Sequence, residues 1–322
     1  MRPETPHDDA QAPLPSPHSS VAHTLALAAG DPITTRAGKT LPPGRDDVDR
    51  FVAMVRSLLF PGFFESSPVE ESAILDWTAS RVEGVHTLLI EMLDCAFTWA
   101  AERSQPLQRS PSSGSRTPRA NAAAVAGRFV ERLPALRQML ALDVEAAYDG
   151  DPAAKHTDET VLCYPGVSAI LSHRIAHALL RDGAPLLPRL IAEACHRDTA
   201  IDIHPGATIG ESFFIDHGTG VVIGETADVG DHVKIYQGVT LGNKSFPKDE
   251  YGQCMRGIKR HPTICDRVTI YANAVVLGGD TVIGENSIIS AGAIVAESIP
   301  PAQLVQQPRS ELVLRPNREV MR

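Results

Sequence analysis

The feature that most constrains the fold is a six-residue repeat of aliphatic residues in the second half of the chain. In "IDIHPGATIGESFFIDHGTG" these residues stand at Ile203, Ile209 and Ile215. The repeat slips by two residues within 216–220, resumes, and is interrupted again by "GNKSFPKDEYGQCMRGIKR". Its later members are Ile223, Val229, Ile235, Leu241, Ile264, Ile270, Val276, Val282, Ile288 and Ile294. An α-helix repeats about every 3.6 residues and a plain strand every 2, so neither explains a step of six.

A parallel β-helix does explain this step. Each six residues form one short flat strand and one tight turn, three such units close a triangular coil, and one aliphatic side chain per strand points inward. Turn residues stand where corners are expected, at Gly210, Gly224, Gly230, Gly242 and Asn273. A β-sandwich is the alternative, but its strands alternate with period 2 and its turns vary in length. We therefore predict a β-helix over 199–299, followed by a C-terminal tail at 300–322.

The first half of the chain lacks the six-residue repeat and differs in composition and in the spacing of its apolar residues. Residues 1–45 are rich in proline and poor in apolar periodicity, which predicts a disordered tail. From 46 to 198 the spacing is helical, as in "DDVDRFVAMVRSLLF", where Phe51, Val55 and Leu58 share one face. The segment 104–121, "SQPLQRSPSSGSRTPRAN", reads as a flexible insertion. The expected fold class is α+β, an all-α helical domain followed by the β-helix.

Composition narrows the classes of function. A formal net charge of -9 over 322 residues argues against a nucleic-acid or anionic-membrane surface. We see neither an apolar run of about 18 residues nor a signal peptide. The five cysteines are scattered and odd in number, which favours a reducing cytoplasm over a disulfide framework.

The two interruptions of the repeat are the expected place for chemistry. A solenoid accepts insertions only outward, and such insertions often form the binding face. The first interruption is "DHGTG", Asp216–Gly220, and the second ends in "KRHP", Lys259–Pro262. Both carry histidine and charge, whereas the regular coils are mostly small and aliphatic.

These motifs resemble one family closely. "DIHPGATIG…IDHGTGVVIGETADVGDHVKIYQGVTLG…IKRHPTI", together with "DGDPAA" before the coils, is similar to serine O-acetyltransferase, a hexapeptide-repeat acyltransferase. The likeness spans about residues 140–300. It implies a left-handed β-helix, a homotrimer or a dimer of trimers, and acetyl-CoA as co-substrate without a metal. It also implies acetyl transfer to L-serine, giving O-acetylserine for cysteine biosynthesis.

The chemistry of such a transfer demands certain residue types. A serine hydroxyl is a weak acid, so a positioned general base must take its proton as it attacks the thioester, and histidine suits this near pH 7. A carboxylate is needed to orient the imidazole. The resemblance assigns these roles to His217 and Asp202. They are 15 residues apart, just under one coil of about 18, which would place them on neighbouring rungs.

The resemblance also assigns the substrate contacts. Asp151 and Asp216 are expected to bind the ammonium group of serine, and Arg260 and His261 its carboxylate, where arginine offers paired donors. Contacts to acetyl-CoA are expected from Gly242, Ala272 and Ser290. In the family, the two halves of the site come from neighbouring subunits.

The chain departs from the family pattern in three places. The loop before Arg260 is longer than the usual form, which alters the acetyl-CoA entrance rather than the chemistry. The segment "VQQPRSE" replaces the family's "GxPA" turn after the coils. The family's tail docks into O-acetylserine sulfhydrylase through a terminal isoleucine, whereas this chain ends in Val320-Met321-Arg322, so we do not expect that complex.

Other functions stay open on the residues alone. A hexapeptide acetyltransferase could act on a sugar, a xenobiotic or homoserine, although a sugar enzyme would not need "DGDPAA". A hexapeptide carbonic anhydrase would bind zinc through histidines, and this chain offers His204, His217, His232 and His261. A catalytically inactive scaffold is the alternative from a different class. It would not require His217 or Asp202 for any turnover.

Overall fold

The computed structural model describes residues 17–27, 38–104 and 117–308. It divides into a short unit, Met1–Leu41, and a large one, Pro42–Arg322. The short unit contains helix α1 (Pro17–Leu27), where the sequence predicted a disordered tail. Proline at its first position favours a helix start, and its described side chains, at 21–26, are exposed. Most of the remaining tail, the residues 105–116 of the insertion, and Val320–Arg322 lie outside the described residues.

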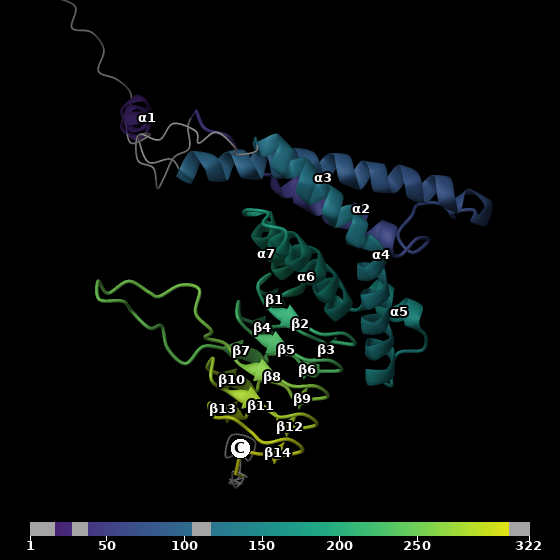
Figure 1. Ribbon diagram of the computed structural model, residues 1–322, viewed down its shortest axis with the longest axis vertical. Helices are drawn as coiled ribbons and strands as arrows, with labels where there is room; N and C mark the ends of the chain where they lie inside the picture. Colours follow the sequence, from purple (N-terminus) through teal and green to yellow (C-terminus); the bar gives the residue numbers. More distant parts are fainter. Residues whose placement is uncertain (1–16, 28–37, 105–116, 309–322) are drawn as a thin grey trace, which may run out of the picture. The chain divides into compact units, whose positions relative to one another are not determined.

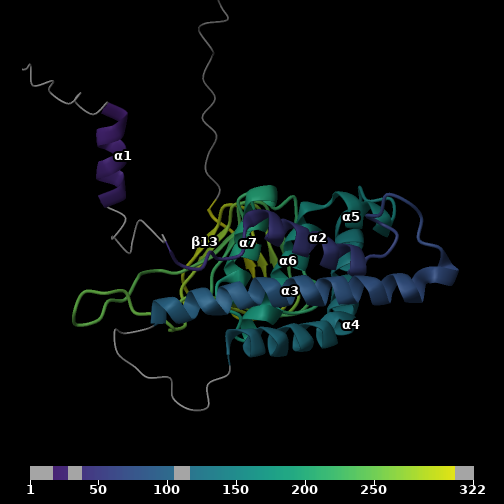
Figure 2. The same ribbon diagram turned by 90° about the horizontal axis from the view of Figure 1, so that it is seen from above.

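The large unit begins with helices. They are α2 (Arg45–Leu59), the 3-10 turn η2 (Glu71–Ala73), α3 (Ile74–Ser104), α4 (Pro118–Gly150), α5 (Thr157–Cys163), α6 (Pro165–Arg181) and α7 (Leu187–Thr199). Figure 2 shows α2, α3 and α4 side by side, with the β-helix beneath them. Helix α4 starts inside the expected insertion, because the Thr117 side chain accepts a hydrogen bond from the Ala120 amide (3.2 Å) and Pro118 occupies the first turn.

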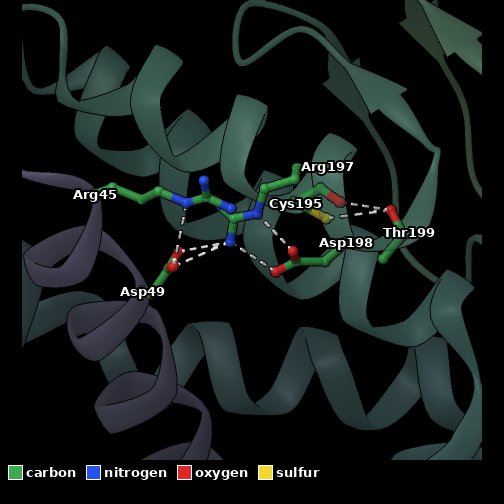
Figure 3. Close-up of polar contacts among 6 residues, drawn as sticks. All are labelled: Arg45, Asp49, Cys195, Arg197, Asp198 and Thr199. Atoms are coloured by element: carbon green, nitrogen blue, oxygen red, sulfur yellow. Dashed lines mark hydrogen bonds and ion pairs between the residues drawn. The ribbon is translucent and has the colours of Figure 1, made fainter.

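Charged side chains help to join the first and last of these helices. Arg197 of α7 donates to both carboxylate oxygens of Asp49 on α2, at 3.0 Å each, and its Nε donates to Asp198 at 2.7 Å (Figure 3). Arg45 lies 4.0 Å from the same Asp49 carboxylate. The pairs are partly exposed, so they add modest stability and mainly set how α2 lies against α7.

The remaining chain forms a parallel β-helix of three sheets (Figure 1). Sheet 1 contains β1 (Asp202–Ile203), β4 (Val222–Ile223), β7 (Thr240–Gly242), β10 (Val275–Leu277) and β13 (Ile294–Val295). Sheet 2 contains β2 (Thr208–Ile209), β5 (Asp228–Val229), β8 (Thr263–Ile264) and β11 (Val282–Ile283). Sheet 3 contains β3 (Phe214–Asp216), β6 (Lys234–Tyr236), β9 (Thr269–Ile270), β12 (Ile288–Ile289) and β14 (Leu304–Val305). We name the turns between the sheets the 1–2, 2–3 and 3–1 corners.

The inward ladder follows the predicted repeat as far as Val276 and then shifts by one residue. Ile283 and Ile289 are fully buried and Val295 nearly so, whereas the predicted Val282, Ile288 and Ile294 point outward, Ile294 with 69% of its surface exposed. The sequence prediction was wrong for these last three positions. Aliphatic residues stand at both positions of each pair, so the pattern could not distinguish them.

The shift has a physical cause at the 1–2 corner. Ile283 follows Val276 by seven positions instead of six, and Gly278 between them has φ 106°. A Cβ on Gly279 would lie 2.4 Å from the carbonyl oxygen of Lys259. The extra residue therefore carries the chain over the returning end of the long loop.

The coils also continue further than the sequence predicted. Strand β14 pairs with β12, Ile288 opposite Leu304 and Ile289 opposite Val305, inside the segment expected to be a tail. The two-residue slip at 216–220 is present as a longer 3–1 corner, because Asp202 pairs with Val222, twenty positions on. No helix in the described part of the chain is both long and apolar enough to cross a membrane.

Candidate active site

The predicted site residues gather at two different corners of the β-helix. His217 and Asp216 lie at the 3–1 corner, with Asp151 brought to their neighbourhood by the end of α4. Arg260 and His261 lie at the 1–2 corner, where the long loop returns to the coil. Sheet 1 separates the two corners within one chain (Figure 1).

His217 occupies a strained turn that holds its side chain outward. It follows β3 with φ 58°, and Gly218 follows with φ 90°. A Cβ on Gly218 would lie 2.4 Å from the Ile201 side chain, so the corner packs closely on the start of the first coil. The His217 side chain is 71% exposed, and its Nε2 lies 3.7 Å from Oδ1 of Asp216. An accessible imidazole beside a carboxylate can accept a proton from a bound substrate.

Asp202 lies on the rung next to this corner. It begins β1 and pairs with Val222, the second residue after the corner, while the Gly220 amide donates to the Ala200 carbonyl at 2.8 Å. No hydrogen bond or ion pair joins Asp202 to His217, both of which the structure describes. In this chain the imidazole is paired with Asp216 instead.

Asp151 is held as a carboxylate at the C-terminal end of α4. Its Oδ2 accepts a hydrogen bond from the Tyr164 hydroxyl (2.5 Å) and its Oδ1 one from the Ala153 amide (2.9 Å). The bond from Tyr164, then the one from Ala153, keeps the pKa of Asp151 below its usual value, and the charges of Lys234 and His217 act in the same direction. The same bond raises the pKa of Tyr164 to about 12. Sequence reasoning missed Tyr164, which carries no motif signal of its own.

A buried ion pair fixes the end of α4 against the first coil. Arg174 of α6 forms a two-pronged contact with Asp143 of α4, Nε to Oδ2 at 2.6 Å and Nη2 to Oδ1 at 2.7 Å. Arg174 also donates to the carbonyl oxygens of Ile209 and Gly210, and Asp143 accepts from the Phe213 amide at 3.0 Å. Both side chains are almost fully buried. This network ties two helices to the turn before β3, which leads into Asp216 and His217.

Lys234 makes a second link between α4 and the coils. Its ammonium donates to the carbonyl oxygen of Gly150, and its Nζ lies 4.9 Å from the centre of the Phe214 ring and 5.0 Å from that of Tyr236. A cation there complements the partial negative charge at the end of α4. The link holds Asp151, the next residue, beside the 3–1 corner.

At the 1–2 corner, Thr226 organises the returning loop. Its hydroxyl oxygen accepts hydrogen bonds from the amides of Arg260 (2.9 Å) and His261 (3.1 Å). Its carbonyl oxygen accepts from Nζ of Lys259 at 2.7 Å, and the same ammonium pairs with Asp228 at 2.5 Å. Thr226 was not among the predicted site residues. It stands one coil before the loop's end at the same corner, so stacking the repeats would have indicated it.

His261 is held neutral in one tautomer. The residue is 7% exposed, and its Nδ1 accepts a hydrogen bond from the Thr226 amide at 3.1 Å, which puts the ring proton on Nε2. Burial, followed by the charge of Arg260, lowers the pKa of His261 to about 4. The ring packs on Gly224, where a Cβ would lie 2.1 Å from Cδ2 and Nε2.

Arg260 already has a partner in this chain. Its guanidinium donates to the carboxylate of Glu225, and this hydrogen bond keeps the pKa of Glu225 below its usual value. Glu225 therefore orients the Arg260 guanidinium at this corner, and the remaining N–H donors of the guanidinium are available for a ligand. Sequence reasoning also missed Glu225, which, like Thr226, stands one coil before the loop's end at the same corner.

The residues expected to contact acetyl-CoA divide between the same two corners. Gly242 ends β7 at the 1–2 corner, where its carbonyl oxygen accepts from the Gly278 amide at 3.0 Å. Ala272 and Ser290 follow β9 and β12 at the 3–1 corner, on adjacent coils. Their contacts to acetyl-CoA remain a prediction.

The histidines considered as zinc ligands lie at three corners. His204 and His261 stand at the 1–2 corner, His217 at the 3–1 corner, and His232 at the 2–3 corner. His204 uses its Nδ1 to accept a hydrogen bond from the Gly206 amide at 2.9 Å. Within the described ranges, no three His, Cys, Asp or Glu side chains are grouped to hold a metal ion.

Comparison with known proteins identifies the family. No family model matches the sequence. The chain is 40% identical over 291 residues to the plasmid serine acetyltransferase of Synechococcus elongatus. The match covers 89% of this chain and 90% of that protein. This chain belongs to the serine acetyltransferase family. It is also 53% identical over 163 residues to the serine acetyltransferase of Mycobacterium tuberculosis, covering 51% of this chain and 67% of that one.

The solved structures agree with this membership. Serine acetyltransferase 1 of Entamoeba histolytica, crystallised in complex with L-cysteine, superposes with a TM-score of 0.68 at 33% identity. The match covers 89% of this chain and 97% of that one. The predicted fold, a helical domain followed by a left-handed parallel β-helix, is confirmed, and the chain is an acyltransferase.

Proposed function

We propose that this serine acetyltransferase family member transfers the acetyl group of acetyl-CoA to the hydroxyl of L-serine with His217 as general base. The observation that carries the proposal is the 3–1 corner. There an exposed imidazole lies beside Asp216, near the ionised Asp151, in a chain whose relatives are named for this reaction. Two carboxylates match the ammonium group of an amino acid, whereas a sugar acceptor brings no positive charge to pair with them.

In this reaction His217 carries the proton from the serine hydroxyl to the sulfur of CoA. The serine oxygen forms a bond to the thioester carbonyl carbon as His217 takes the hydroxyl proton, and the carbon–sulfur bond then breaks. The imidazolium returns the proton to the departing CoA sulfur, so the enzyme ends unchanged. Asp202, on the neighbouring rung, is the proposed orienting carboxylate. Its role requires the His217 ring to turn away from Asp216, which frees Asp216 for the substrate ammonium.

We further propose that each site is built from two chains. His217 and Arg260 lie at corners on opposite edges of sheet 1, so one chain does not bring the two halves together. A neighbouring copy in a homotrimer, packed along the coils, would supply the Arg260 and His261 half. Those two side chains would then hold the serine carboxylate, with Gly242 of one chain and Ala272 and Ser290 of the other along acetyl-CoA.

The acceptor is tested by measuring thiol release from acetyl-CoA against L-serine, homoserine, sugars and chloramphenicol. We expect turnover with L-serine at the highest kcat/KM. Turnover with a sugar or chloramphenicol but not with serine would overturn the proposal.

The shared site is tested by mixing two inactive variants. His217→Ala and His261→Ala each remove one half, and co-expressed chains form some sites with both wild-type residues. Activity should reappear in the mixture, given that His261→Ala alone is nearly inactive. Mixed trimers, verified by differential tags, that show no recovery would mean that each site is built within one chain.

A further inference from the structure

A cavity in the helical region is lined by none of the residues predicted for catalysis or substrate binding. It has a volume of about 620 Å³, opens to the surface, and is lined by α2, the segment 64–73 and the first turns of α3. Its helical lining follows the helix period, with Arg50 and Ser57 on α2 and Trp77 and Arg81 on α3, and Ala73 of the 3-10 turn η2 lies just before them. Pockets for small molecules have volumes of about 300–1,000 Å³, so this one is large enough for a ligand.

Three arginines face this cavity without a carboxylate partner. Among the described residues, Arg50, Arg56 and Arg81 form no ion pair. The Arg56 guanidinium carbon lies 4.2 Å from the centre of the Phe64 ring, and that of Arg81 lies 5.2 Å from the Trp77 ring. Stacking uses the flat face of a guanidinium, so the N–H donors at its edge stay available. The Nε of Arg56 is buried and has no hydrogen-bond partner.

The two carboxylates in the lining do not neutralise these arginines. Glu65 is already bound within its own loop, where it accepts hydrogen bonds from the Ser57 hydroxyl (2.5 Å) and the amides of Gly62 (2.7 Å) and Phe64 (3.2 Å). Glu70 is exposed at the edge. The three arginines and two carboxylates leave the lining with a net positive charge. The arginines form no ion pair, and one of the carboxylates, Glu65, is already hydrogen-bonded within its loop.

We propose that this cavity binds a small molecule that carries a phosphate group, a function beyond the acetyl transfer proposed above. A phosphate carries nearly two negative charges and three acceptor oxygens near neutral pH. Arginine forks bind such groups in a two-pronged manner, and three arginines in one lining match a dianion better than a single carboxylate. The Phe64 and Trp77 rings give the cavity an aromatic wall, which favours a ligand with a flat ring beside its phosphate.

Isothermal titration calorimetry on the full chain tests the site. The probes are inorganic phosphate and phenyl phosphate, with phenol as the analogue that lacks the phosphate. We expect saturable binding of both phosphates, tighter for phenyl phosphate, and none of phenol. Arg56→Gln and Arg81→Gln should each raise Kd at least about tenfold, the usual effect of losing a hydrogen bond to a charged group. The matched control, Arg137→Gln, changes an exposed arginine on α4 outside the cavity and should leave Kd unchanged.

A second variant protects the test against misfolding. Arg56 packs on Phe64, so its loss could disturb the loop, whereas Ser67→Asp adds a negative charge at the exposed side of the lining without removing packed atoms. It should also weaken phosphate binding about tenfold, with unchanged thermal unfolding. The proposal is overturned if the wild type shows no saturable phosphate binding. It is equally overturned if the cavity variants bind like the wild type, or if Arg137→Gln loses as much affinity as they do.

Discussion

Gly224→Ala tests whether the 1–2 corner positions His261 as the structure indicates. Gly224 follows β4, and a Cβ there would lie 2.1 Å from Cδ2 and Nε2 of the His261 ring. Its φ is not positive, so alanine suits the backbone and the ring is the obstacle. Ordinary carbon contacts need about 3.5 Å, so the ring must move by about 1.4 Å.

Such a movement breaks the contacts that hold the ring. Nδ1 of His261 lies 3.1 Å from the Thr226 amide nitrogen and 2.9 Å from its hydroxyl oxygen, and neither hydrogen bond survives a shift of that size. Because a misplacement of about 1 Å can cost about 100-fold in rate, we expect kcat/KM for serine to fall by about 10- to 100-fold. Most of the loss should appear in KM for serine, since His261 is proposed to bind its carboxylate. KM for acetyl-CoA should change by less than about twofold.

Steady-state thiol-release kinetics with two controls decide the matter. Gly127→Ala in α4 makes the same chemical change where a Cβ meets nothing within 4 Å, and should keep wild-type activity. In a His261→Ala background the clash is gone, so adding Gly224→Ala should cost nothing more. Wild-type kcat/KM in Gly224→Ala, or a full additional loss in the double variant, would refute the reasoning.

Three further predictions follow from the same geometry. His217→Ala should lower kcat about 10²–10⁴-fold in the thiol-release assay, the usual contribution of a positioned general base, and retention of half the activity would remove it from the mechanism. Arg174→Met should lower the free energy of unfolding by about 3–5 kcal/mol in urea titrations, because it leaves Asp143 buried without its partner; a loss below about 1 kcal/mol would contradict this. The pKa of His261 is lowered from 6.5 to about 4, so the unfolded chain binds more protons between these values, and the stabilisation present above pH 6.5 should be lost as pH falls toward 4. Urea titrations at several pH values across that range give the free energy of unfolding, which should change less steeply with pH for His261→Asn than for the wild type. An equal dependence on pH in both proteins would show that the ring does not contribute.

The repeat predicted the fold because a β-helix imposes a local rule on every rung. An inward position must be apolar and a corner must accept a turn, so Ile203, Ile223 and Leu241 reveal the coil without any knowledge of contacts. The same rule made interruptions visible, and both corners of the candidate site lie at interruptions. It failed after Val276, where Val282 and Ile283 are both aliphatic and one extra corner residue changed which of them points inward.

What the sequence by itself determined is the architecture and, through its motifs, the family. The same motifs predicted the candidate site residues. Only the tertiary structure decided how those residues are held. Thr226 and Glu225 meet His261 and Arg260 because successive coils stack, and Asp143 reaches Arg174 because α4 packs on α6. These contacts join residues about 30 or more positions apart, and each depends on the direction of a side chain. No local pattern records that direction, because it is set by the packing of elements that meet only after the chain has folded.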